Sequence, residues 1–165
     1  MPDHVIDTNV LLVASAAHPF SPFDDSHVPV EQQLQVLDWL MTFNDDDSRR
    51  LVLDDRFAIL GEYRHKLNEQ DVGFQVVREK MQARRTAMIT LDADGHAVVP
   101  AGLQACDPSD RKFLAAALTD AAGISIVNAT DSDWIEIEDA LRAAGVVVDH
   151  VIEAWLRTWM ARRAR

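Results

Sequence analysis

The stretch "HVIDTNVLLVA", residues 4–14, carries one carboxylate, Asp7, between two apolar runs. "HVID" is typical of a short buried strand and the following "NVLLVASAA" of a helix, so Asp7 marks the point where one becomes the other. A buried charge without a partner costs several kcal/mol. Asp7 is therefore a helix cap, a solvated residue at a strand end, or one member of a charged cluster.

The composition predicts one globular domain. The chain has 165 residues, of which 48% are hydrophobic, enough to bury a core. A single cysteine, Cys106, excludes an internal disulfide and a cysteine-based zinc site, and it suits a reducing compartment. No apolar run approaches the roughly 20 residues of a membrane span, and the first residues lack the pattern of a signal peptide. We therefore expect a cytoplasmic protein that does not bind membranes.

The formal net charge of the chain is −11. Proteins that coat DNA or RNA regardless of sequence normally carry the opposite charge, so this balance argues against that class. It does not argue against a nuclease, because bound metal ions that face the phosphate invert the local charge.

Short apolar segments alternate with amphipathic ones along the chain. This alternation predicts βαβ units, and hence an α/β fold with a mostly parallel sheet and helices on both faces. We expect strands at 4–7, 51–54, 124–129 and 146–151, and a hairpin within 88–100. We expect helices at 9–17, 31–43, 56–67 and 72–85, within 107–123, and at 131–145 and 152–165.

Two of the expected helices have an apolar face that predicts which side is buried. In the helix at 56–67, this face consists of Phe57, Leu60, Tyr63 and Leu67. In the helix at 31–43, the face consists of Leu34, Leu37, Leu40 and Met41.

Acidic residues recur close to the carboxyl ends of the expected strands. One closes the first strand, one lies in the helix after the second, two precede the helix "RKFLAAAL", and two follow the strand "ISIVNA". In parallel α/β sheets ligands bind outside this edge, so we expect these carboxylates to surround one small volume. They are Asp7, Glu62, Asp107, Asp110, Asp131 and Asp133.

Each of these acids also has a simpler explanation, because acids commonly cap helices and occupy turns. As a group they are harder to explain in that way. Two carboxylates about 4 Å apart repel by roughly 4 kcal/mol at an effective dielectric constant of 20. A cluster of several would strain a domain with only about 5–15 kcal/mol of stability, and a divalent cation removes that strain. Ligands that are all oxygen select Mg²⁺ or Mn²⁺.

Four sequence blocks, in this order and spacing, resemble the PIN-domain family. They are "VIDTNVLLVA", "LDDRFAILGEYRHKL", "DPSDRKFLAAAL" and "ISIVNATDSDW", and together they span residues 4 to about 150. The resemblance implies a three-layer α/β/α sandwich with a central, mostly parallel sheet. It implies a PIN-like nuclease domain over 1–150. The residues at 151–165 predict an amphipathic basic helix that packs on the same domain, with contact to RNA or to a second copy of the chain as the alternatives.

The resemblance also implies an activity, that of a Mg²⁺- or Mn²⁺-dependent endoribonuclease that hydrolyses phosphodiester bonds in RNA. The four principal acids, which would be catalytic and hold the metal, match Asp7, Glu62, Asp110 and Asp131. Asp107 and Asp133 match supporting acids at the same metal site. Thr8 and Asn9 match the residues that orient the acids through hydrogen bonds.

Several partners follow from the same resemblance. Many bacterial relatives are toxins held silent by an antitoxin, so the resemblance implies an RNA substrate and leaves open an antitoxin or another protein partner. A homo-oligomer is a further alternative. Arg64, Arg111 and Lys112 flank the acids, where they would either contact the RNA backbone or pair with neighbouring carboxylates. The alternative function is a catalytically silent PIN-like module that binds protein or RNA.

Three other chemistries are disfavoured by the residues themselves. An aspartyl-phosphate phosphotransferase of the haloacid-dehalogenase type needs an acid two residues after the nucleophile, and Asn9 stands there. "EYRH" is one Glu-x-x-His motif where a di-iron bundle needs two, which makes His65 an ordinary helix residue. Cys106 has no base placed for it, which favours a packing role.

Overall fold

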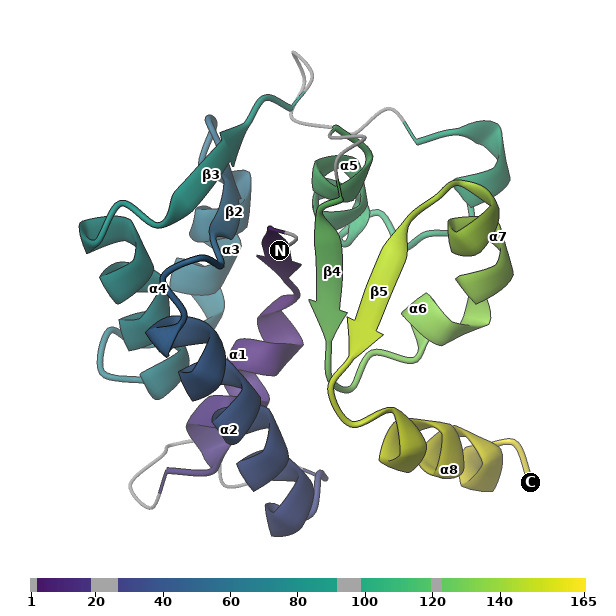
Figure 1. Cartoon of the computed structure of the whole chain (residues 1–165). Helices are drawn as coiled ribbons and strands as arrows, with labels where there is room; N and C mark the ends of the chain where they lie inside the picture. The colour runs from purple at the N-terminus through teal and green to yellow at the C-terminus, as the bar shows by residue number, and fades with distance from the viewer. Residues whose placement is uncertain (1–2, 19–26, 92–98, 120–122) are drawn as a thin grey trace.

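The computed structural model describes residues 3–18, 27–91, 99–119 and 123–165 (Figure 1). Its five strands form one parallel sheet in the order β3-β2-β1-β4-β5, which confirms the predicted α/β class. The first strand of the chain lies in the middle of the sheet. The strands are β1 (His4–Ile6), β2 (Leu51–Asp54), β3 (Thr86–Ile89), β4 (Ser125–Asn128) and β5 (Val147–His150).

The three central strands are buried along their whole length, whereas residues of the edge strands β3 and β5 are partly exposed. Continuous burial is expected for parallel strands covered by helices on both faces. The helices are α1 (Thr8–Ala16), α2 (Val30–Asp45), α3 (Ala58–Lys66), α4 (Val72–Gln82), α5 (Arg111–Thr119), α6 (Asp133–Glu136), α7 (Glu138–Ala143) and α8 (Glu153–Arg163), with a short 3₁₀ helix, η1 (Ala101–Leu103).

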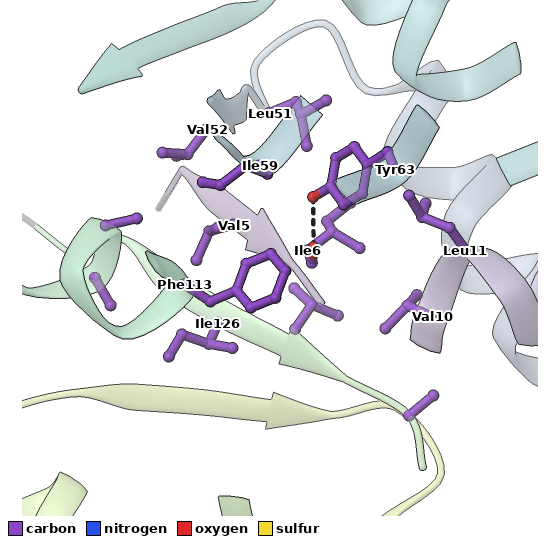
Figure 2. Close-up of a cluster of buried hydrophobic side chains, with 14 of the residues drawn as sticks. Val5, Ile6, Val10, Leu11, Leu51, Val52, Ile59, Tyr63, Phe113 and Ile126 are labelled. Atoms are coloured by element: carbon purple, nitrogen blue, oxygen red, sulfur yellow. Dashed lines mark hydrogen bonds between the residues drawn. The ribbon is translucent and has the colours of Figure 1, made fainter. Parts of the chain in front are cut away.

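The side chains of β1 show the two helical layers. His4 points to one face, where its ring packs edge-on against Trp39 and Phe43 of α2 at centroid distances of 6.0 and 5.6 Å. Val5 points to the other face, where Phe113 of α5 lies beside it (Figure 2). Because neighbouring residues of a strand face opposite sides, α2 and α5 cover opposite faces of the sheet. The three-layer α/β/α arrangement is thereby confirmed.

Helix α3 is fastened to the central strand close to Asp7. The Tyr63 hydroxyl donates a 2.5 Å hydrogen bond to the carbonyl of Ile6 (Figure 2). At the start of α3 the buried carboxylate of Asp54 accepts hydrogen bonds from the backbone N–H groups of Arg56, Ala58 and Ile59. These contacts hold the helix that carries Glu62 against the carboxyl edge of the sheet.

The structure confirms most of the expected inner faces of two helices, since Leu40, Leu60, Tyr63 and Leu67 are buried, and it corrects three residues. Leu34 and Met41 of α2 are 51% and 39% exposed, and the fully buried residues are Val36, Leu40 and Phe43. Helix α2 has apolar residues on two sides. The buried side is the one whose Phe43 contacts His4 and Arg49. Phe57 is 56% exposed with φ 59°, because the turn that Asp54 caps places it in the left-handed region before α3 begins.

Three element boundaries also differ from the expectation. The helix at 72–85 ends at Gln82, where Arg84 with φ 57° turns the chain into β3. The first arm of the expected hairpin at 88–100 belongs to β3, which pairs in parallel with β2, and residues 92–98 lie outside the described residues. The helix at 131–145 is divided at Ile137 into α6 and α7.

Helix α8 contacts the rest of the domain through a small set of side chains. Leu156 is buried, and Trp155 and Trp159 pack on His27 at centroid distances of 5.7 and 5.1 Å. Arg157 pairs with Glu138 of α7 at 2.6 Å. Within the described part of the chain, no helix is both long and apolar enough to cross a bilayer.

Candidate metal centre

Three carboxylates that are far apart in the sequence meet at the carboxyl edge of the sheet. Asp7 follows β1, Asp131 follows β4, and Asp110 immediately precedes α5. One oxygen from each lies within 4.8 Å of an oxygen from both of the others. Strands β1 and β4 are paired neighbours, so their ends carry Asp7 and Asp131 to the same place. The sequence predicted this convergence for these three residues.

Asp7 is the most deeply buried of the three, with 5% of its surface exposed. Its Oδ2 accepts a 2.8 Å hydrogen bond from the Trp134 indole, and its Oδ1 accepts one of 3.2 Å from the backbone N–H of Asn9. It caps α1 and belongs to the cluster at the same time, so two of the three explanations for it hold together. Burial raises the pKa of Asp7 to about 6, because its hydrogen bonds only partly offset the loss of water and the nearby carboxylates add to the shift.

The other two carboxylates are also perturbed. Burial, together with the negative charges of Asp7 and Asp131, raises the pKa of Asp110 to about 7. Burial likewise raises the pKa of Asp131, although the Asp133 backbone N–H donates a 2.9 Å hydrogen bond to its Oδ1. All three carboxylates therefore lack sufficient positive charge nearby, and either a proton or a cation would stabilise them.

Two asparagines hold the loop that carries Asp131. Asn9 donates from Nδ2 to Asn128 Oδ1 at 3.0 Å, and its Oδ1 accepts from the N–H groups of Ala129 and Thr130. Asn128 accepts from the N–H of Asp131 at 3.1 Å and donates to its carbonyl at 2.8 Å. Asn9 thus acts on the backbone beside Asp131.

Asn128 and Trp134 were missed by sequence reasoning, although a buried polar residue at the end of an apolar strand is a usable signal.

Glu62 is not brought into the group of three. Its Oε1 accepts a 2.5 Å hydrogen bond from the Thr8 hydroxyl, and its Oε2 forms an ion pair with Lys112. Lys66 lies 3.4 Å from Oε1. Burial pushes the pKa of Glu62 upwards, but the hydrogen bonds from Lys112 and Thr8 and the lysine charges bring it below its ordinary value.

Asp107 and Asp133 also lie outside the group among the described residues. Asp107 is exposed, and its Oδ1 accepts hydrogen bonds from the N–H and the hydroxyl of Ser109, which lower its pKa. Asp133 is exposed in the first turn of α6. The contacts of Asp107 are those of a turn before a helix, the simpler explanation considered for these acids.

The basic residues near the site are partly engaged within the protein. Arg111 donates to the carbonyls of Cys106 and Gln104 at 3.3 and 3.2 Å, and Lys112 binds Glu62 and the Ser109 carbonyl. Arg64 is exposed on α3. Cys106 is buried, and burial raises the pKa of its thiol to about 12, so the thiol is protonated at neutral pH and is not a nucleophile.

The metal-free protein is expected to lose stability as the pH rises. The raised pKa values of about 6 for Asp7 and about 7 for Asp110 mean that the folded state holds more protons than the unfolded state at intermediate pH. The stabilising contribution is complete below about pH 4 and is lost as the pH rises through about 6 to 7. Urea unfolding in a chelating buffer measures the free energy of unfolding at pH 5 and at pH 8. We expect it to be lower at pH 8 by roughly one or two kcal/mol. Asp110→Asn should show a shallower slope, and equal slopes would contradict the assignment.

No family model, curated protein or solved structure matches this chain.

Proposed function

We propose that this protein is a divalent-metal-dependent endoribonuclease of the PIN-domain family. The observation that carries the proposal is the convergence of Asp7, Asp110 and Asp131 at the carboxyl edge of a parallel sheet. This is the edge at which α/β folds bind ligands. RNA as the substrate is supported by the four sequence blocks that resemble the family.

The donor set fits a hard cation. The ligand atoms on offer are carboxylate oxygens, and the pKa values of all three acids are raised by burial, as expected where negative charge lacks compensation. Oxygen ligands favour Mg²⁺ and Mn²⁺ over zinc and copper. Asp7, Asp110 and Asp131 would hold the ion. Once bound, such an ion activates water and stabilises the charge that develops on a phosphodiester.

The protein's own contribution is to hold these oxygens in place. The Trp134 indole and the Asn9 backbone fix both oxygens of Asp7, so the carboxylate cannot rotate freely. Asn128 fixes the backbone of Asp131 from both sides. When the ligand oxygens are already fixed in the free protein, ion binding loses less side-chain conformational entropy. Such preorganisation increases the affinity for the ion.

The two rival functions have less support. An aspartyl-phosphate mechanism is disfavoured because Asn9, two residues after Asp7, is an amide engaged with the Asp131 loop. A catalytically silent module has no need for three repelling carboxylates, which cost stability unless a ligand uses them. The proposal includes the toxin role that the family resemblance implies, in which a protein partner keeps the nuclease silent.

Incubation of purified protein with end-labelled single-stranded RNA tests the activity. We expect cleavage with millimolar Mn²⁺ or Mg²⁺ and none with a chelator, because the three acids cannot activate water alone. A DNA strand of the same sequence separates ribonuclease from general nuclease activity. Asp7→Asn is the contamination control, since it removes the charge while its amide oxygen still accepts from one of the two donors, the Trp134 indole or the Asn9 backbone N–H. Equal cleavage by the wild type and this variant would overturn the assignment.

A further inference from the structure

Glu62 differs from the three clustered acids because its charge is already compensated. Both of its oxygens have partners: Thr8 and Lys66 at Oε1, and Lys112 at Oε2. The Glu62 side chain is 15% exposed and that of Lys112 is 14% exposed, whereas Lys66 is 49% exposed. The pairing with Lys112 is therefore the protected one, and solvent screens the pairing with Lys66.

Lys112 is positioned by contacts on several sides. Its ammonium group donates to the carbonyl of Ser109, binds Glu62, and lies 4.7 Å from the centroid of the Phe113 ring. It stands two residues after Asp110, in the first turn of α5. A fixed positive charge is thus built into the rim of the acidic group by the same helix that supplies one of its carboxylates.

The electrostatic consequences separate the four acids into two sets. Oxygens of Asp7, Asp110 and Asp131 lie within 4.8 Å of one another, whereas Glu62 stands outside that group and has an ammonium group on its Oε2. The first three retain an unmet demand for positive charge. A bound ion would stabilise Glu62 much less than it stabilises these three carboxylates, because it would first have to displace the Lys112 ammonium group from Glu62.

We propose that Lys112 serves in place of a second cation, so that the site binds one divalent ion on Asp7, Asp110 and Asp131. Glu62 is then a positioning residue, which anchors Lys112 and accepts from Thr8 at the start of α1. The inference rests on the proposed metal site and specifies how many ions that site holds. Removal of the ammonium group leaves Glu62 available as a ligand for a second ion.

Titration of full-length protein with Mn²⁺, with free ion followed by electron paramagnetic resonance, counts the bound ions. We expect the wild type to bind one ion per chain and Lys112→Met to bind two. Lys66→Met is the matched control, because it also removes a lysine paired with Glu62, but an exposed one, and it should still bind one ion. Glu62→Gln should bind one ion with affinity within about threefold of the wild type, a change of well under 1 kcal/mol.

The outcomes distinguish this inference from the function on which it rests. No ion bound to the wild type would remove the metal site and the proposed nuclease with it. Two ions bound to the wild type, or one bound to folded Lys112→Met, would overturn the inference and leave the metal site standing. Should Lys112→Met fail to fold, Glu62→Gln decides: a loss of affinity above about tenfold would make Glu62 a ligand and overturn the inference.

Discussion

Asp110→Asn is expected to lower the rate of RNA cleavage by more than about 100-fold, since even partners of metal ligands are commonly worth 10- to 100-fold. The same substitution should stabilise the metal-free protein. It removes one of three carboxylates whose oxygens lie within 4.8 Å of one another, and burial together with the charges of Asp7 and Asp131 raises the pKa of Asp110 to about 7. We expect a gain of about 1–2 kcal/mol at pH 8, after allowance for partial exposure. Cleavage assays and urea unfolding measure the two effects.

Asp107→Asn is the matched control for this prediction. Asp107 lies three residues earlier, is exposed, and hydrogen-bonds to Ser109 instead of joining the group. Its substitution should leave cleavage within about twofold of the wild type, as for most surface changes away from a site. If both variants lose activity equally, or if Asp110→Asn is as active as the wild type, the three-carboxylate site is the wrong one.

The largest effect on stability is expected at Gly73, where α4 crosses α1. A methyl group on Gly73 would stand 2.6 Å from the carbonyl oxygen of Leu11 and 2.9 Å from its Cα. These are backbone atoms of α1, so the clash cannot be relieved by a side-chain rotation. The Gly73 N–H also donates to the Ser15 hydroxyl at 3.0 Å, a bond that a separation of the helices would break. Gly73→Ala should cost about 2–4 kcal/mol.

Gly61→Ala provides the control for this comparison. Gly61 lies in α3, and a Cβ built there meets no atom within 4 Å. Glycine within a helix is destabilising by roughly 0.5–1 kcal/mol relative to alanine, so this substitution should stabilise the protein. Urea unfolding of both variants measures the contrast. A neutral Gly73→Ala would show that α1 and α4 are not in such close contact in solution.

The sequence was most informative about the sheet and about the acids at strand ends. Buried segments such as 51–54 predicted strands because parallel strands covered on both faces are apolar throughout. Asp7 and Asp131 followed from the same pattern. Any residue directly after a parallel strand must lie at the carboxyl edge, whatever its neighbours are. The position of Asp110 depended on one further step, the turn into α5.

Helix orientation could not be derived from periodicity in α2. The segment has two apolar sides, and local spacing favoured the one with Leu34 and Met41. The structure buries Val36, Leu40 and Phe43, since Phe43 also stacks on Trp39 and meets His4 of β1. Which side of α2 is buried therefore depends on its contact with His4, about 40 positions away in the sequence. The local spacing of apolar residues contains no information about that contact.

The sequence by itself determined a mostly parallel sheet with acids at its carboxyl edge, because strand direction suffices to place a residue at that edge. It named six such acids, and the structure brings three of them together, Asp7, Asp110 and Asp131. Tertiary structure alone decided that Glu62 pairs with Lys112, that Trp134 binds Asp7, and that Asn128 holds the Asp131 loop. Hydrogen bonds and ion pairs form only within a few tenths of an ångström of a preferred distance. Such precision arises when helices from distant parts of the chain are packed and rotated against one sheet.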